Sequence, residues 1–241
     1  MLHLLPICCS GCWMRIRHPE ITPTLNERRL FLCEVCVRAL WHLRIPSDSP
    51  SLGGGDTVSL YRYEGLIRDL IWRAKIKDDH GALDLLVERG LIPKAVATGH
   101  WADLIVAAPS SLWGRLRGRL DLASHLALAL AQCVQKPTIP APLHLYWRMS
   151  KNAQKGTIER AATGSPAHFS RWELHCLSAW SQNPSVKSGK RCSQTLRILM
   201  VDDVVTTGST LRRVGSALTE ACQLQGLRPE LRALALAKSG A

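Results

Sequence analysis

The most constraining feature of this 241-residue chain is an apolar run that ends in two adjacent carboxylates. Residues 196–201, Leu-Arg-Ile-Leu-Met-Val, are typical of a buried β-strand. Asp202 and Asp203 follow, and a small polar loop then leads into an amphipathic helical pattern that begins at Leu211. This order of strand, acidic pair, loop and helix predicts an α/β unit with functional groups at the carboxyl end of a strand.

The loop after the acidic pair has the chemistry of a phosphate site. It consists of Val205, Thr206, Thr207, Gly208, Ser209 and Thr210. Hydroxyl groups, the backbone N–H groups exposed at Gly208 and the positive end of the following helix all favour a phosphate monoester. Adjacent carboxylates suit vicinal hydroxyls, directly or through Mg²⁺. We therefore expect Asp202 and Asp203 to face solvent and to hold the 2′ and 3′ hydroxyls of a ribose 5-phosphate.

This run resembles the motif with which type I phosphoribosyltransferases bind PRPP, 5-phosphoribosyl 1-diphosphate. A receiver domain also has a strand that ends in two acids, but it needs on the order of a hundred further residues to complete its sheet. The printed sequence ends at Ala241, too soon after Asp203 for that fold. A plain buried strand with a capped helix stays open as an alternative, although it gives no reason for two consecutive acids.

Four cysteines near the N-terminus have the spacing of metal ligands. Cys9, Cys12, Cys33 and Cys36 form the pattern C-x₂-C-x₂₀-C-x₂-C, which predicts a closed, structural Cys₄ zinc site. Cys8 is an alternative to Cys9 as a ligand. The segment between the two pairs has few large apolar residues, so we expect it to need a metal or a crosslink to fold. Disulfides and a redox-active pair are the competing interpretations.

Composition limits the class of protein. The chain has nine cysteines, and its apolar start at residues 1–7 is too short for a secretory leader, so we expect a reducing cytoplasm. No apolar run reaches the ~18 residues of a membrane span, and the 46% hydrophobic content supports a core. The formal net charge of +12 suits polyanionic partners.

The chain divides into a small module and a larger domain. We expect a Cys₄ zinc-finger-like module at residues 1–48, a linker at 49–57 and an α/β domain at 58–241, because residues 46–55 are rich in Pro, Ser and Gly. Strand and helix patterns alternate in the large domain, which predicts a mostly parallel, doubly wound sheet. The expected strands lie near 58–63, 104–108, 196–201 and 231–237, and the expected helices near 65–77, 83–91 and 120–134.

The whole order of features resembles the ComF family of competence proteins, also described as predicted amidophosphoribosyltransferases. The matching pieces are the four-cysteine start, the block with Tyr61, Tyr63, Gly65, Arg68, Leu70, Ile71 and Lys75, the strand that ends in Pro109, the arginines at 115, 117 and 119, the segment 148–160 and the Asp-Asp loop. Two features depart from the family pattern. Arg119 is followed by Leu120, Asp121 and Leu122, and the segment 168–194 is longer and more polar than expected.

The resemblance implies a type I phosphoribosyltransferase-like fold that binds PRPP with Mg²⁺ and carries a structural zinc module. It also implies a role in natural competence, in which the protein handles incoming single-stranded DNA beside a helicase-like partner. The alternative is an active phosphoribosyltransferase of nucleotide metabolism, which transfers ribose 5-phosphate from PRPP to an unknown acceptor. The sequence leaves open whether the protein is catalytically active, because no general base stands out.

Two basic clusters are candidates for contacts with pyrophosphate or with DNA phosphates. Their members are Arg115, Arg117 and Arg119 in the first cluster, and Arg148, Lys155 and Arg160 in the second. Clustered cations bind polyanions through phosphate contacts that release counterions. The alternative for both clusters is a solvated basic surface.

Overall fold

A five-stranded sheet forms the centre of the computed structural model, which describes residues 8–15, 20–22, 30–45, 57–109, 119–139 and 195–240. The strands are β3 (Thr57–Arg62), β4 (Leu104–Ala107), β5 (Thr138–Ile139), β6 (Thr195–Val205) and β7 (Arg228–Lys238). Their order in the sheet is β3-β7-β6-β4-β5, and every neighbouring pair is parallel. The expected parallel α/β architecture is therefore confirmed.

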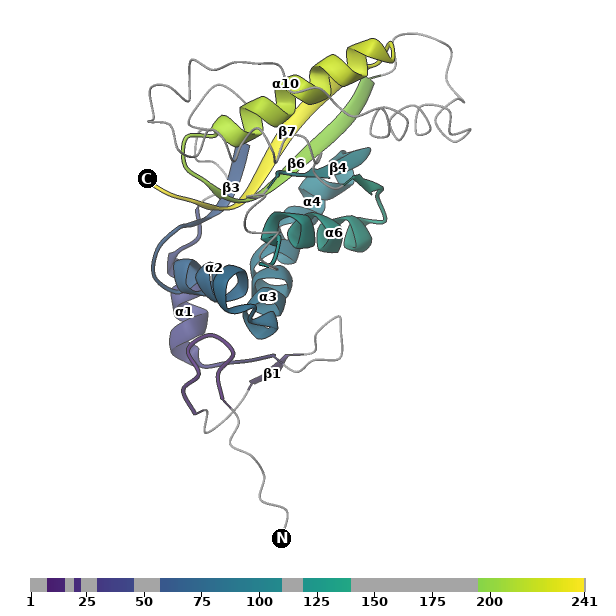
Figure 1. The fold of residues 1–241 in the computed structure, drawn as a ribbon. Helices are drawn as coiled ribbons and strands as arrows, with labels where there is room; N and C mark the ends of the chain where they lie inside the picture. The colour runs from purple at the N-terminus through teal and green to yellow at the C-terminus, as the bar shows by residue number, and fades with distance from the viewer. Residues whose placement is uncertain are drawn as a thin grey trace.

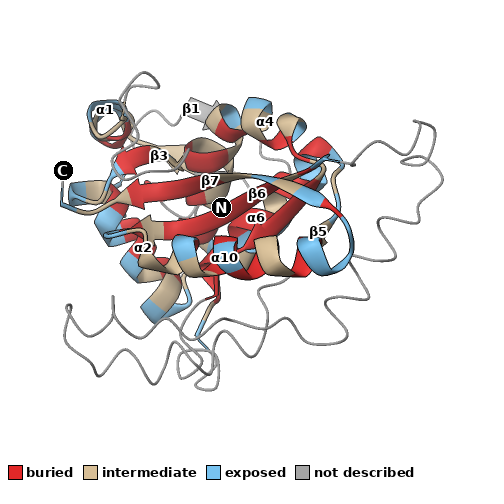
Figure 2. Ribbon diagram, turned by 90° about the horizontal axis from the view of Figure 1, so that it is seen from above, coloured by how far each residue is buried: buried red, intermediate tan, exposed pale blue. Residues whose placement is uncertain are grey.

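Helices cover both faces of this sheet (Figure 1). One face packs against α2 (Gly65–Lys77), α3 (His80–Leu85), η1 (Leu86–Leu91), α4 (Ile92–Trp101) and α6 (Leu122–Val134). The other face packs against α10 (Ser209–Leu224). In Figure 2 the strands are mostly buried, while the outer side of α10 is exposed. Apolar strand residues point alternately to the two faces, as the two-residue period of a strand requires.

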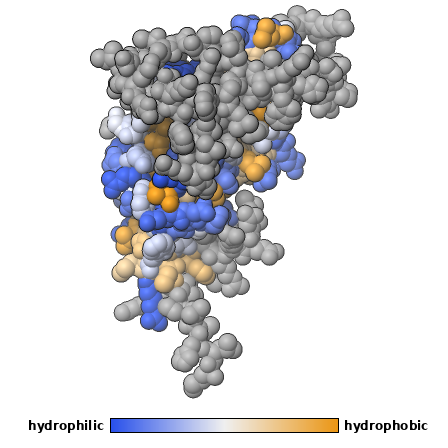
Figure 3. Space-filling view, in the orientation of Figure 1, coloured by the Kyte–Doolittle hydropathy of each residue, from blue (hydrophilic) through white to orange (hydrophobic). Residues whose placement is uncertain are grey.

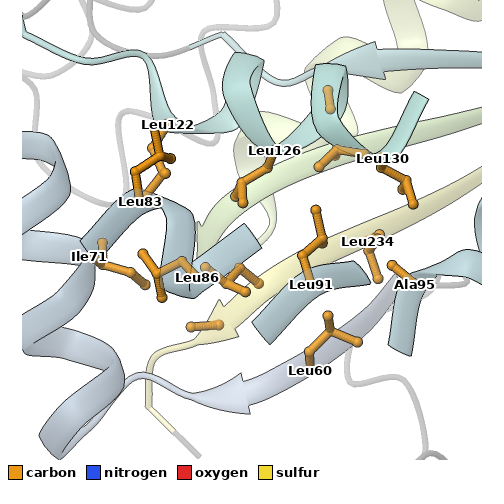
Figure 4. Close-up of a cluster of buried hydrophobic side chains, with 14 of the residues drawn as sticks. Leu60, Ile71, Leu83, Leu86, Leu91, Ala95, Leu122, Leu126, Leu130 and Leu234 are labelled. Carbon is orange, nitrogen blue, oxygen red and sulfur yellow. The ribbon is translucent and has the colours of Figure 1, made fainter. Parts of the chain in front are cut away.

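The larger core lies between the sheet and the helices of the first face. Leu122, Leu126 and Leu130 recur along α6 at helical spacing and are fully buried. They lie opposite Leu91 and Leu234, which come from η1 and from strand β7 (Figure 4). This packing fixes where α6 begins, and therefore which residues reach the carboxyl edge of the sheet.

The side of the sheet to which the next strand is added changes between β4 and β6, since β4 is followed by β5 on one side and β6 by β7 on the other. These two strands are adjacent, yet β4 is followed by α6 on one face and β6 by α10 on the other. Such a topological switch point opens a crevice at the carboxyl ends of the strands, where ligands bind in open α/β sheets. The residues that follow β6 lie at this edge.

The N-terminal module, residues 8–45, packs beside the sheet at β3. It contains the antiparallel pair β1 (Glu20–Thr22) and β2 (Leu30–Leu32), followed by α1 (Glu34–His42). Ile45 donates a backbone hydrogen bond to Leu60, and Arg62 donates one to Leu43, so the chain after α1 covers the edge of β3. Figure 3 shows apolar residues mixed with hydrophilic ones on the surface of the lower part of the view, where the N-terminal module lies.

Some elements differ from expectation. The strand expected at 196–201 continues to Val205, because β7 pairs with it along this length. The helix expected at 83–91 is the middle of a longer helical run from His80 to Trp101, whose central turn is a π-helix. Helix α1 and the two-residue strand β5 were not predicted from the sequence. The segments 16–19, 23–29, 46–56, 110–118 and 140–194 lie outside the described residues.

No helix in the described ranges is both long enough and apolar enough to cross a membrane.

One ion pair joins the amino-terminal ends of β4 and β6. Asp103 accepts hydrogen bonds from the Arg197 backbone at 3.0 Å and from its guanidinium at 2.9 and 3.1 Å. Burial acts to raise the pKa of Asp103, but the Arg197 contacts outweigh it, so the pKa lies below its usual value. We expect Asp103→Asn to lower the free energy of unfolding at neutral pH by about 1 kcal/mol, since Arg197 is partly exposed.

This loss should depend on pH. A carboxylate with a lowered pKa in the folded state stabilises the protein above the unfolded pKa, about 3.9 for Asp, and the contribution disappears as the pH falls through the folded value. Urea unfolding at about pH 7 and about pH 2 should therefore show a difference between Asp103→Asn and wild type at the higher pH alone. Asp69→Asn, at an exposed ion pair 3.5 Å long, is the matched control and should have little effect. An equal loss in both variants would contradict this account.

Candidate functional site

The acidic pair lies inside β6 and is buried. The expectation that Asp202 and Asp203 face solvent is wrong, since their exposed fractions are 9% and 6%. The physical reason is the long parallel pairing with β7, in which Asp202 is opposite Ala235 and Val205 is opposite Lys238. The pair therefore belongs to the sheet, and Val205 is a buried strand residue that precedes the loop.

Lys75 compensates one of the two carboxylates. Its Nζ lies 2.6 Å from Oδ2 of Asp203, a contact that joins helix α2 to β6. Burial acts to lower the pKa of Lys75, but the Asp203 carboxylate outweighs it and the pKa is raised. Lys75 is therefore charged near neutral pH.

Lys75 was not predicted as a site residue, although the helical pattern of the sequence contains the signal. Ile67, Ile71 and Lys75 follow one another at intervals of four residues. Lys75 is therefore on the same side of the helix as the two buried isoleucines. A charged residue at such a position needs a buried partner of opposite sign. Asp202 and Asp203, two consecutive acids, were the candidates for that partner.

Asp202 is the less compensated member of the pair. Its Oδ1 accepts a hydrogen bond of 2.8 Å from the Asp203 backbone N–H. Burial and the neighbouring Asp203 carboxylate raise the pKa of Asp202 to about 8, and Asp121 adds to this effect. The centre of the site is thus short of positive charge, and it suits a cation or hydroxyl donors.

Asp121 comes to the same place from a different element. It is the residue before α6, buried at 8% exposure, and accepts hydrogen bonds from the Ser124 backbone and from the Ser124 hydroxyl. Asp121 is near enough to Asp202 to help raise the pKa of that carboxyl, so it belongs to the same group of residues. The fold therefore gathers Lys75, Asp121, Asp202 and Asp203 from three separate parts of the chain.

The loop between β6 and α10 has the geometry of an anion site. Thr206 and Thr207 are exposed, and Gly208 adopts the left-handed conformation with a φ of 69°. A Cβ at Gly208 would meet nothing closer than 3.5 Å, so the backbone angle, not space, requires glycine here.

Helix α10 begins directly after this glycine, at Ser209 and Thr210. Its first intrahelical bond runs from the Arg212 N–H to the Gly208 carbonyl, and the Thr207 hydroxyl accepts a 3.4 Å bond from the Ser209 N–H. The N–H groups of the first turn and the partial positive charge of a 16-residue helix point toward the loop. This arrangement can hold a phosphate group beside the acidic pair.

The basic clusters fall mainly outside the described residues. Arg115 and Arg117 lie there, as do Arg148, Lys155 and Arg160. Arg119 is described and is exposed just before α6. The contacts expected of these arginines and of Lys155 stay predictions.

Four cysteines come together in the N-terminal module. The Sγ atoms of Cys9, Cys12, Cys33 and Cys36 all lie within 4.8 Å of one another. The distance between Cys12 and Cys33 is 3.7 Å, close to the spacing of about 3.8 Å that a tetrahedron of 2.3 Å Zn–S bonds gives. The arrangement can hold a metal ion such as zinc.

The local backbone supports this group. Burial acts to raise the pKa of Cys9, but backbone N–H groups of Cys33, Cys12 and Gly11 outweigh it and lower the pKa to about 7. A Cβ at Gly11 would lie 2.9 Å from Sγ of Cys36, so only glycine lets the two halves close. The structure also decides between two ligands, because Cys8 is exposed and takes no part in the group.

Arg73 attaches this module to the large domain. Its guanidinium donates to the carbonyls of Ser10 and Gly11, stacks on the Trp13 ring at 4.2 Å and pairs with Asp79 at 2.6 Å. Arg73 is on α2, two residues before Lys75. One helix therefore contacts both the first cysteine turn and the acidic pair.

The chain matches no family model and no curated protein. Function is therefore inferred from the geometry of the described residues and from the motifs in the sequence.

The ion pair between Lys75 and Asp203 can be tested by substitution. Lys75→Met leaves the Asp203 carboxylate buried without a cation, so we expect the free energy of unfolding to fall by about 1–3 kcal/mol, less than for a fully enclosed pair because Lys75 is partly exposed. Adding Asp203→Asn should recover part of this loss. Lys77→Met, at an exposed position two residues on, is the matched control in urea unfolding. Equal effects of the two lysine variants would show that the pair does not stabilise the fold.

Proposed function

We propose that this protein binds PRPP with Mg²⁺ and has a type I phosphoribosyltransferase-like fold of the kind found in ComF proteins. The supporting observation is the position of the buried acidic pair, with Lys75, directly before a hydroxyl-rich loop at the start of a long helix. These groups lie at the switch point of a parallel sheet. A ligand with a diol and a phosphate at opposite ends matches both halves of the site.

Each residue has a distinct task in this proposal. Asp202 and Asp203 accept hydrogen bonds from the ribose hydroxyls or hold Mg²⁺, and Lys75 forms an ion pair with Asp203. Thr206, Thr207, Ser209 and Thr210 donate hydroxyl hydrogen bonds to the 5-phosphate together with the backbone N–H groups. Bound Mg²⁺ supplies positive charge for the pyrophosphate group.

The biological role rests on the sequence resemblance. We propose that the protein acts in natural competence, where it handles incoming single-stranded DNA in the cytoplasm beside a helicase-like partner. The net charge of +12 supports a polyanionic partner, and the exposed Arg119 is a candidate contact. Transfer of ribose 5-phosphate to an acceptor is the alternative activity of the same site, and release of pyrophosphate from PRPP distinguishes the two.

We also propose that the four cysteines hold one structural Zn²⁺. The sulfur spacing and the N–H groups directed at Cys9 support this assignment. All four positions are occupied by protein ligands, so the metal would stabilise the fold and leave no open position for a substrate.

Calorimetric titration tests PRPP binding. Wild-type protein should bind PRPP with Mg²⁺ and bind it much more weakly with chelator. Asp202→Asn and Asp203→Asn together should weaken binding by at least tenfold, because amides of the same size are poorer ligands for Mg²⁺ than carboxylates and change the packing little. Thr206→Val should weaken it by about tenfold or more through one lost hydrogen bond to a charged phosphate.

Asp69→Asn, on the exposed side of α2, is the control and should bind as wild type does. Circular dichroism of each variant checks that the fold is retained. Equal PRPP affinity in wild type and in the folded Asn double variant would contradict the proposed site. Pyrophosphate release measured in the same samples then reports whether bound PRPP is turned over.

Metal analysis tests the zinc proposal. Protein purified without chelator should carry about one zinc per chain. Cys36→Ser should lose the metal and destabilise the N-terminal module, because three ligands close the site poorly. Cys8→Ser is the matched control next to Cys9 and should keep its zinc. Retention of zinc by Cys36→Ser, or its loss from Cys8→Ser, would contradict the assignment.

A further inference from the structure

A cavity of about 300 Å³ lies between the N-terminal module and the large domain. Its described walls come from β2, α1, the turn after α1, η1 and α4. The lining residues are Leu32, Val37, Leu40, Trp41, Arg44, Arg89 and Pro93. None of them belongs to the acidic pair, the phosphate loop or the Cys₄ group. The cavity is therefore a separate candidate site.

The charged residues among these walls are both arginines. Arg44 and Arg89 line the cavity, and its described lining contains no carboxylate. Lys94 is also close, with its Nζ over the Tyr61 ring at 4.8 Å. Burial and then the charge of Arg44 lower the pKa of Lys94 to about 8. The local charge is thus positive, and an anion would neutralise it.

The neighbours of Arg44 fix the position of its side chain beside the cavity. The backbone around it pairs with β3 at Tyr61, and its guanidinium stacks on the Trp41 ring at 3.7 Å. Its Nε is buried and has no hydrogen-bond partner among the described residues. Because this atom has almost no accessible surface, a ligand in the cavity would meet other atoms of the Arg44 side chain.

Arg89 comes from the π-helix η1. The hydroxyl of Tyr61 lies 3.4 Å from the Arg89 carbonyl and 3.3 Å from the Gly90 carbonyl, so the buried tyrosine supports the irregular turn. Turns of this kind are rare and frequently occur at functional sites. Here the turn brings a second guanidinium to a cavity that already contains Arg44.

The other residues that line the cavity can pack against an aromatic ring. Leu32, Val37, Leu40 and Pro93 are aliphatic, and the Trp41 side chain is 62% exposed although one face is covered by Arg44. An indole that is open on its second face can stack on an aromatic ring. The volume is at the small end of the range for ligand pockets, about 300–1,000 Å³, which suits one nucleotide.

We propose that this cavity binds a phosphorylated nucleoside, with the base against Trp41 and the aliphatic wall and the phosphate between Arg44 and Arg89. Two guanidinium groups can bind the phosphate oxygens in the paired geometry that arginine favours. The same chemistry occurs in a free mononucleotide and at the phosphorylated end of a single strand. The proposal is independent of PRPP binding.

Calorimetry of the full chain with 5′-AMP tests this proposal, with adenosine and inorganic phosphate as ligand controls. Arg89→Gln and Trp41→Leu should each weaken AMP binding by about tenfold or more, through a lost charged hydrogen bond and a lost stacking surface. Arg228→Gln and Trp72→Leu are matched controls, because both residues are exposed and outside the cavity. Thr206→Val separates this site from the loop after β6.

Weaker binding in the cavity variants alone, with AMP preferred over adenosine and phosphate, supports the proposal. It is overturned when Arg89→Gln and Trp41→Leu bind AMP as their controls do, when adenosine binds as tightly as AMP, or when Thr206→Val alone removes binding. A 5′-phosphorylated oligothymidylate distinguishes the two sources of the ligand. If the oligothymidylate displaces AMP from wild type but not from Arg89→Gln, the cavity accepts a strand end. If only AMP binds, the ligand is a free nucleotide.

Discussion

The ion pair between Lys75 and Asp203 is the contact on which the candidate site depends. Two consecutive carboxylates in the middle of a parallel sheet repel each other and lose their hydration, so they need a cation nearby. Helix α2 supplies one cation for two acids, 2.6 Å from Asp203. The arrangement leaves Asp202 with a raised pKa and the site with unmet demand for positive charge. A site that is incompletely compensated in this way is stabilised when a cation or a hydroxylated ligand binds.

The same helix connects this site to the N-terminal module. Arg73 fixes the first cysteine turn through two backbone carbonyls, while Lys75, two residues later, fixes the acidic pair. A shift of α2 along its axis would disturb both contacts, because a packed helix moves as a unit. The Cys₄ group therefore contributes to the geometry of the site at a distance, by holding one end of α2. This gives a structural reason for the two parts to occur in one chain.

The sequence predicted those features that depend on local patterns. The bounds of α2 agree with the expected 65–77, since apolar spacing and a glycine at the start are local signals, and the strand, loop and helix around Gly208 were found for the same reason. The burial of Asp202 was missed because it depends on how far β7 pairs with β6. The partner of Lys75 is 128 residues away, and no periodicity reports such a contact.

The charge distribution of the whole chain bears on how a polyanion reaches the site. The protein has a net charge of +12, which attracts polyanions from a distance, but the centre of the candidate site contains three buried acidic residues and one lysine. A free pyrophosphate group would be repelled there at short range, whereas the same group complexed with Mg²⁺ would not. In the proposed function, the net charge would attract the ligand from a distance, and the acidic pair would then favour its metal-bound form. The excess positive charge then lies outside the centre of the site, so the proposed contact with single-stranded DNA would not require the strand to enter the acidic centre.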